Sequence, residues 1–415
     1  MVSTTHDAAG EALTSALGTA HVRPADPGTS AAGRTPRWIV TASSTEQIST
    51  ALRLCGEHGL AVVPKGSGSK LDWGARPTGA DVLLDTSANT GVREHAAGDL
   101  VVHARAGTPL SEVNASTRVA GQQLAIDHPL PGATLGGIVA TAAGGPCRHL
   151  FGGVRDLLIG ITAVLADGTV ATSGGKVVKN VAGYDLGKLY TGSWGTLGVI
   201  TETIFRLHPL AEEHRWVSIT CPDPADAATA AEAVRRSQAM PTAVEIDRPA
   251  PGAPAEVCAQ LEGRADATGS RAQHLADRLG GRVLDAAPPW WAAYPFDPAT
   301  GIGIRVGFAP ARVDRLLRLA EESPVPPAVR GAAGLGVLHL GLPGDAPAEH
   351  VAELLTQLRA DCDYAAIERA PAAVHALADP FGDGSAGLRA LLRRTKDQFD
   401  PQHNLAPGRH VGGTR

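Results

Sequence analysis

Four glycine-rich or small-residue segments follow one another in a fixed order, and they constrain the fold of this chain more than any other feature. They are Gly132–Gly137, Val154–Asp156, Lys179–Leu186 and Gly195–Glu202. Each adjoins an apolar run rich in β-branched residues, which can anchor the segment while its backbone comes close to a partner. Backbone suited to such close approach predicts a large, flat ligand that carries phosphate.

The size and charge of the chain narrow the class of protein. Its 415 residues exceed the roughly 250–300 that one hydrophobic core usually serves, so two domains are expected. The formal net charge of -5 and the sequence pI of about 6.3 give no general basic surface. Nucleic acid is therefore excluded as the main partner.

The cysteines give no sign of a disulfide framework or a metal site. The five are scattered, odd in number and without a CxxC pair, so neither an iron–sulfur nor a zinc site is expected, and we predict no metal. The first residues lack a charged region followed by an apolar one, so we expect no signal peptide, and no apolar run approaches the ~20 residues needed to span a bilayer. We expect a cytoplasmic protein that reaches the inner face of a membrane only through partner subunits.

The first half of the chain is predicted to be mixed α/β. Residues 1–36 lack apolar periodicity and are expected to form a mobile tail with one short helix. Trp38–Val40 and Ala61–Val63 are predicted strands, and Ser44 begins a capping-box helix that ends near residue 56. Residues 159–166 and 169–172 flank Asp167-Gly168 and predict a hairpin.

The second half shows a different pattern. After residue 209, strands alternate with amphipathic helices in two similar rounds, which predicts an α+β sandwich with one helical face and a duplicated split βαβ unit. Within it, Trp290, Trp291 and Tyr294 form an aromatic cluster expected at an interface or domain seam. A last helix is predicted over Gly387–Phe399, followed by a fixed exit through Pro401 and Pro407.

The loop Val63–Lys70 predicts an anion site. It follows a strand and places two glycines in a sharp turn, so several N–H groups can point inward to a pyrophosphate. The GxGxxG fingerprint fails because Leu71 occupies the third glycine position, and no GxxxxGK[ST] loop exists. Five of the six lysines lie in the same half of the chain and predict an electropositive region: Lys65, Lys70, Lys176, Lys179 and Lys188. The alternatives are a chance cluster for the lysines and a simple turn for the loop.

Taken together, five segments resemble the FAD-binding domain of the vanillyl-alcohol-oxidase-like (PCMH-type) flavoproteins. Within that group, the chain is most similar to the FAD-binding subunits of bacterial glycolate oxidases. The resemblance covers about Trp38 to Leu210, and the ending from Lys396 to Arg409 resembles the family's C-terminal return. The five segments are Pro64–Gly68, Pro131–Gly145, Phe151–Asp156, Lys179–Leu186 and Gly192–Gly198.

The resemblance implies an α+β fold with a PCMH-type FAD-binding domain, an α/β cap and a C-terminal segment returning to the FAD domain. The implied bounds are 37–211 for the FAD-binding domain, 212–370 for the cap and 371–415 for the returning segment, after the tail over 1–36. The residues implied to contact FAD are Pro64, Lys65, Gly66, Ser67, Gly68, Ser69, Pro131, Gly132, Ala133, Thr134, Gly136, Gly137, Gly144, Gly195, Gly198, Val199 and Ile200.

The candidates for substrate chemistry are fewer. Where related 2-hydroxy-acid enzymes carry a histidine-rich segment, this chain keeps only His339, within Val337–Gly344. Arg305, in a predicted apolar strand, is the candidate for bidentate carboxylate recognition, with an edge-strand surface arginine as the alternative. Trp194 and Ala406 also depart from the family pattern.

Covalent attachment of flavin is not expected within residues 65–70, which contain no histidine or cysteine. The alternative attachment points are Cys147 and His149. A buried Cys147 that serves only in packing is the stronger interpretation.

The resemblance implies FAD-dependent oxidation of a small 2-hydroxy acid, glycolate or D-lactate, by one subunit of a complex. The implied partners are a second flavoprotein subunit and an iron–sulfur subunit. Two alternatives stay open: a self-sufficient FAD-linked dehydrogenase of another alcohol, and a non-catalytic structural or electron-relay subunit.

Overall fold

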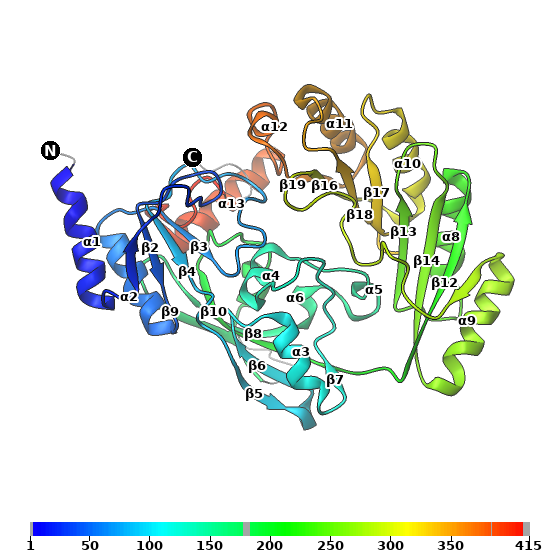
Figure 1. Cartoon of the computed structure of the whole chain (residues 1–415), viewed down its shortest axis with the longest axis horizontal. Helices are drawn as coiled ribbons and strands as arrows, with labels where there is room; N and C mark the ends of the chain where they lie inside the picture. Colours follow the sequence, from blue (N-terminus) through cyan, green and yellow to red (C-terminus); the bar gives the residue numbers. More distant parts are fainter. Residues whose placement is uncertain (1–2, 177–182, 383, 410–415) are drawn as a thin grey trace.

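The computed structural model describes residues 3–176, 183–382 and 384–409, and it shows two domains side by side (Figure 1). The first domain is built around a four-stranded and a five-stranded sheet, and the second around one eight-stranded sheet. This arrangement is the predicted FAD-binding domain followed by a cap.

The four-stranded sheet carries the predicted anion loop at the end of one strand. Its order is β1-β2-β4-β3, with β2 and β3 each parallel to β4. Ser44 caps α2 by accepting a hydrogen bond from the Gln47 N–H at 3.3 Å, which confirms the predicted helix start. The elements are β1 (Val22–Pro24), β2 (Trp38–Thr41), α2 (Thr45–Glu57), β3 (Val62–Lys65) and β4 (Val82–Asp85).

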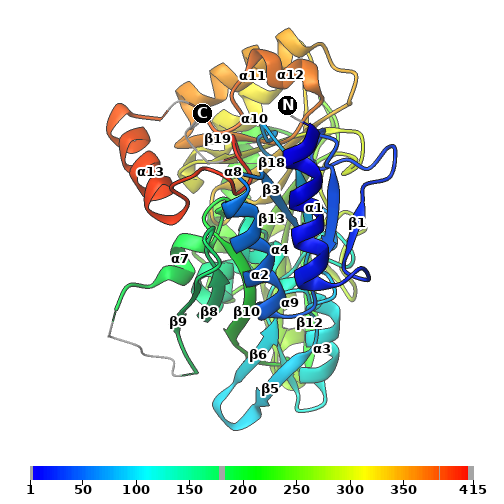
Figure 2. The same cartoon turned by 90° about the vertical axis from the view of Figure 1, so that its left-hand side faces the viewer.

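The N-terminal segment differs from the mobile tail that we predicted. Helix α1 (Ser3–Leu17) lies alongside α2, and β1 pairs with β2 (Figure 2). Ala9 and Leu13 are buried in the core of this sheet, with Ala12 and Leu17 packed against it. One short helix was expected in this segment, but its apolar stripe consists half of alanine, and this weak hydrophobic signal did not predict that the helix packs on the sheet.

The five-stranded sheet is antiparallel throughout, in the order β5-β6-β10-β8-β9. Its last two strands are the predicted hairpin. Helix α4 packs its buried Leu135 and Ile138 into the same core as Phe205 of β10. The strands are β5 (Val92–Ala96), β6 (Val101–Arg105), β8 (Leu158–Val164), β9 (Val170–Gly174) and β10 (Val199–Arg206).

Short helices and one small sheet complete the first domain. They are η1 (Ala97–Asp99), α3 (Leu110–Arg118), α4 (Leu135–Thr141), α5 (Arg148–Phe151), α6 (Val154–Leu157) and α7 (Leu186–Tyr190), with β7 (Gln122–Gln123) paired to β11 (His208–Pro209).

The cap sheet confirms the predicted duplication. Each half follows the order strand, helix, strand, strand, helix, strand, and the sheet order β15-β12-β14-β13-β17-β18-β16-β19 places the second strands of both halves, β13 and β17, side by side at the centre. The first half comprises β12 (Glu213–Cys221), α8 (Pro224–Arg235), β13 (Ala243–Arg248), β14 (Ala255–Gly263), α9 (Ala265–Leu279) and β15 (Arg282–Leu284). The second comprises β16 (Ile302–Gly307), η2 (Pro310–Arg312), α10 (Val313–Glu322), β17 (Ala328–Ala332), β18 (Val337–Leu342), α11 (Ala348–Asp361) and β19 (Tyr364–Arg369).

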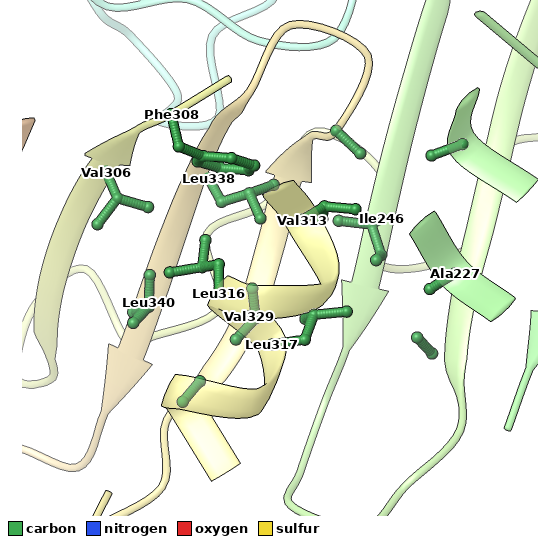
Figure 3. Close-up of a cluster of buried hydrophobic side chains, with 14 of the residues drawn as sticks. Ala227, Ile246, Val306, Phe308, Val313, Leu316, Leu317, Val329, Leu338 and Leu340 are labelled. Atoms are coloured by element: carbon green, nitrogen blue, oxygen red, sulfur yellow. The ribbon is translucent and has the colours of Figure 1, made fainter. Parts of the chain in front are cut away.

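The helices of the cap cover one face of its sheet, and Figure 1 shows that face turned away from the first domain. In the core beneath α10, Val329, Leu338 and Leu340 pack against Leu316 and Leu317 (Figure 3). Because side chains alternate along a strand, the residues between these apolar positions point to the opposite face. That face is directed at the first domain.

The C-terminal segment returns to the first domain, but later than predicted. Helix α12 (Ala372–Leu377) still packs on α11, with Val374 in the cap core. Phe381 contacts Trp194 of the first domain, and α13 (Ala386–Phe399) and the chain after it pack there, where Leu405 bridges Val62 at the free side of β3. Among the residues described, none of the helices has the length and apolar character that crossing a bilayer requires.

Candidate functional site

A cleft opens in the first domain where four segments converge. These are the loop after β3, the start of α4, the turn leading into β10 and the C-terminal segment. Both Lys65 and Arg409 line it, so it receives side chains from the beginning and the end of the chain. The cleft is therefore assembled only when the C-terminal segment has returned.

Glycine allows the walls of this cleft to approach one another. A Cβ at Gly66 would lie 2.4 Å from Thr134 Oγ1, and one at Gly195 would lie 2.6 Å from Pro64 Cγ. Gly68 has a φ of +85°, a conformation that side-chain-bearing residues rarely adopt. Bare backbone therefore lines the cleft, as expected where a ligand lies against main-chain N–H groups.

The lysine that begins the loop is already paired. Lys65 Nζ lies 2.5 Å from Asp85 Oδ2, and neither side chain is more than a quarter exposed. Burial would raise the pKa of Asp85, but the hydrogen bonds from Lys65 and Ser87 outweigh it and lower the pKa. The Lys65 charge is thus largely offset by Asp85.

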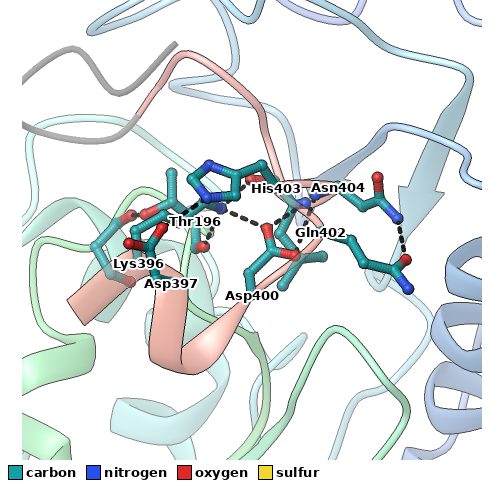
Figure 4. A network of polar contacts seen from close by, with 9 residues as sticks. Thr196, Lys396, Asp397, Asp400, Gln402, His403 and Asn404 are labelled. Carbon is teal, nitrogen blue, oxygen red and sulfur yellow. Dashed lines mark hydrogen bonds and ion pairs between the residues drawn. The ribbon is translucent and has the colours of Figure 1, made fainter. Parts of the chain in front are cut away.

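The C-terminal segment holds two walls of the cleft. Arg409, 4% exposed, donates to the carbonyls of Leu71 and Trp73 at 3.0 and 2.6 Å. Lys396 donates to the carbonyl of Thr196 at 2.7 Å and to Asp400 Oδ2 at 2.5 Å (Figure 4). Burial lowers the pKa of Arg409 to about 10, so the guanidinium stays charged at neutral pH.

A row of polar side chains crosses the inner face of the cap sheet. Arg330 is paired in register with His339, and His339 with Arg305 on the next strand. His339 Nδ1 lies 2.7 Å from Glu368 Oε2 on β19. Burial would raise the pKa of Glu368, but His339, Lys70 and Arg305 outweigh it and lower the pKa to about 2.

The two domains meet where this row faces the cleft. Lys70 Nζ lies 2.8 Å from Tyr294 Oη and 4.5 Å from the ring centroid of Trp73. The Tyr294 ring in turn lies 5.2 Å from the His339 ring. Burial lowers the pKa of Lys70 to about 8 and that of His128, which also faces Lys70, to about 4. We call Lys70, Tyr294, Arg305, His339 and Glu368 the seam cluster.

Most residues predicted to contact FAD line this one cleft. Three do not: Pro131 and Gly132 lie in an exposed turn, and Gly144 lines a neighbouring cavity. The residues that line the cleft are Pro64, Lys65, Gly66, Ser67, Gly68, Ser69, Ala133, Thr134, Gly136, Gly137, Gly195, Gly198, Val199 and Ile200.

The other candidates have separate places. Arg305 and His339 lie together in the seam cluster, and β16 is not an edge strand, because β18 and β19 pair with it. Cys147 is buried, as the packing interpretation predicted. Lys176 and Lys188 pair with surface carboxylates, so the five lysines do not form one region, and Lys179 lies outside the described residues, as does half of its motif.

Sequence reasoning missed several residues of the site. Lys70 was noted only as the end of the anion loop and as one of the lysine group, whereas Glu368 and the hydrogen bond from Lys396 to the Thr196 carbonyl were not noticed. Glu368 lies in a strand whose apolar residues alternate with others, so alternation alone could have placed its side chain on the same sheet face as His339. Within the described ranges, His, Cys, Asp and Glu side chains do not gather in threes in a way that could hold a metal ion.

Comparison with known proteins identifies the first domain. Residues 36–174 match the model of a family described as an FAD binding domain. The glycine-lined cleft, in which added Cβ atoms would meet the opposite wall, fits this cofactor because FAD presents a pyrophosphate to main-chain donors. FAD is the cofactor of this domain.

Three curated relatives share part of the sequence. A D-lactate dehydrogenase of Archaeoglobus fulgidus is 35% identical over 50% of this chain and 46% of its own length. Glycolate oxidase subunit GlcE of Escherichia coli is 41% identical over 36% of this chain and 42% of its own, and subunit GlcD of Bacillus subtilis is 34% identical over 43% and 38%. Each match covers less than half of the relative.

Solved structures share the fold over nearly the whole chain. p-Cresol methylhydroxylase with substrate bound superimposes with a TM-score of 0.77 at 16% identity, covering 99% of this chain and 97% of that one. A 4-ethylphenol oxidase from Gulosibacter chungangensis gives 0.75 at 16% identity, covering 99% and 98%. Fold and cofactor domain thus define a class: a flavoprotein with a VAO/PCMH-type FAD-binding domain and a cap. Within this class the chain is related, over part of its length, to glycolate oxidase subunits and D-lactate dehydrogenases.

Proposed function

We propose that this chain is an FAD-dependent oxidoreductase that oxidises a small 2-hydroxy acid, glycolate or D-lactate. The observation that carries the proposal is the seam cluster, which places a histidine, a carboxylate and an unpaired guanidinium opposite the FAD cleft. The names of the three relatives point in the same direction.

His339 has the geometry of a general base. Glu368 is ionised at neutral pH and can only accept, so it holds His339 with the proton on Nδ1. The lone pair on Nε2 is then left to take the proton of the substrate hydroxyl. This arrangement orients the ring and stabilises the imidazolium that forms.

Arg305 is suited to the substrate carboxylate. Among the described residues it has no hydrogen-bond or ion-pair partner, and its Nε is buried. A planar guanidinium in that state can bind a carboxylate through two parallel hydrogen bonds. The C–H bond of the bound acid would then face the cleft, and FAD, when bound there, supplies the acceptor for the hydride.

The test is flavin reduction by the purified chain. Anaerobic addition of glycolate or D-lactate should bleach the flavin absorption band, and Arg305→Met should raise the substrate concentration needed by about tenfold to a hundredfold. His339→Gln should instead slow bleaching at saturating substrate. Bleaching by a simple alcohol but by no 2-hydroxy acid would favour a dehydrogenase of another alcohol. A colourless purified protein would favour a structural subunit.

We further propose that the chain works in a complex with a second flavoprotein subunit and an iron–sulfur subunit. The support is that two of the relatives are named as glycolate oxidase subunits. Co-purification from the native host, followed by iron analysis of the complex, tests it. A chain that elutes alone at its own mass would contradict the proposal.

A further inference from the structure

A second cavity lies in the seam, beside the FAD cleft. It is lined from the first domain by Gly144, Gly145 and Arg148, and from the cap by Glu245, Tyr294, Arg330 and His339, among others. Its room corresponds to about two water molecules, enough for one carboxylate. We call it the seam cavity.

Two charged side chains of the seam cavity lack partners. The half-buried Arg148 side chain forms no hydrogen bond or ion pair with any described residue. Glu245 is 5% exposed, and its Oε1 atom is buried without a hydrogen bond. A buried polar group left unsatisfied costs about 1–3 kcal/mol, so the buried Glu245 Oε1, which lines one cavity together with the unpartnered Arg148 guanidinium from the other domain, indicates a missing ligand.

The charge of the seam cavity favours an anion. Arg330 is already offset, because its Nε donates to Asp247 Oδ1 at 2.7 Å. Burial, followed by the nearby charge of Asp127, raises the pKa of Glu245 well above its usual range, which favours the neutral carboxyl, the form that can donate a hydrogen bond. Of the two arginines that line the seam cavity, Arg148 is the one without an ion-pair partner among the described residues.

The seam cavity continues from the proposed catalytic site. Its lining includes His339 and Tyr294, and it extends on the side of β17 and β13. Arg305 lies on the other side of His339, on β16, one strand spacing or about 4.8 Å away. A ligand whose reacting carbon is at His339 can therefore extend one end to Arg305 and the other into the seam cavity.

We propose that the seam cavity binds a second carboxylate of the substrate, and that the chain prefers 2-hydroxy dicarboxylic acids over glycolate and D-lactate. This inference rests on the proposed function. Arg148 pairs with the distal carboxylate, and Glu245 donates a hydrogen bond to it. A monocarboxylic 2-hydroxy acid leaves both groups unpaired.

The first test measures binding without turnover. Succinate and glutarate, titrated calorimetrically into the FAD-loaded protein, should bind at least tenfold more tightly than propionate. Arg148→Met should weaken diacid binding about tenfold to a hundredfold and Arg148→Lys less, while Arg155→Met, on an exposed arginine of α6, should change nothing. Glu245→Gln should keep the affinity, because it remains neutral and can still donate. Equal binding of diacids and propionate, or no effect of Arg148→Met, would overturn the inference.

The second test separates this inference from the proposed function. Flavin should be reduced by D-2-hydroxysuccinate or D-2-hydroxyglutarate at lower concentrations than by D-lactate, and Arg148→Met should remove that preference without slowing D-lactate. If glycolate and D-lactate reduce flavin as well as the diacids do, the inference fails and the proposed function stands. If no 2-hydroxy acid reduces flavin, the proposed function fails, whatever the diacids do in the binding test.

Discussion

Replacing Lys396 by methionine tests how the C-terminal segment holds the FAD cleft. Lys396 and Asp400 are 2% and 0% exposed, and all three ammonium hydrogens are used, on Asp400, on the Thr196 carbonyl and on the Leu405 carbonyl (Figure 4). Methionine keeps the apolar stem but removes the charge and the three donors.

The expected cost follows from what is left behind. Removing one partner of a buried ion pair typically costs about 3–5 kcal/mol, because the other charge stays buried without compensation. Asp400 retains hydrogen bonds from the Asn404 and Leu405 N–H groups, so we expect about 3 kcal/mol for Lys396→Met. Lys188→Met is the matched control, since that exposed lysine pairs with Asp185 at an i,i+3 spacing and should cost less than about 1 kcal/mol.

Two measurements check this prediction. Urea unfolding gives the loss of stability, and the flavin content after gel filtration shows whether the Thr196 turn still shapes the cleft. Lys396→Met should lose both stability and flavin, and adding Asp400→Asn should restore part of the stability by removing the stranded charge. Equal stability losses in Lys396→Met and Lys188→Met would refute the reasoning.

Gly66→Val and Gly68→Val should each yield protein with little flavin. The first side chain would push against Thr134 Oγ1, and the second would force a β-branched residue to positive φ. The control Gly98→Val, at a position with open space around it, should keep its flavin. Normal absorbance spectra for both cleft variants would contradict this assignment. His128 has a folded-state pKa of about 4 and an unfolded one near 6.5, so the unfolded chain binds more protons between these values and stability falls as pH drops through this window. Between pH 7 and pH 5, the free energy of unfolding of His128→Gln should therefore fall by about 2 kcal/mol less than that of the wild type, as measured by urea midpoints. Equal losses in both proteins would show that another group is responsible.

Local patterns predicted most of the fold. The Ser44 cap, the hairpin around Asp167-Gly168 and the duplicated cap unit were all visible, because capping, turn chemistry and alternation act within a few residues. A short helix was expected within residues 1–36, but its packing on the first domain was missed, since the buried stripe of α1 is half alanine. The late return of the C-terminal segment was missed because Val374 looks like any other apolar helix residue.

The candidate site was likewise predicted where the signal is local in the sequence and missed where it depends on contacts between distant residues. Glycines of the cleft could be placed from the sequence, because close approach and positive φ both favour glycine. The seam cluster could be found only in part: Arg305 and His339 stood out in apolar strands, but nothing near Lys70 or Glu368 in the sequence indicates that they belong together.

What the sequence by itself determined is the cofactor domain, through an ordered set of glycines that fixes how closely main chain can approach a ligand. What only the tertiary structure decided is which charges meet. Lys70 and Tyr294 are 224 positions apart, and Lys396 and Thr196 are 200 apart. Side-chain chemistry says which groups can pair, but the packing of the cap and of the returning segment against the first domain selects the pairs that form.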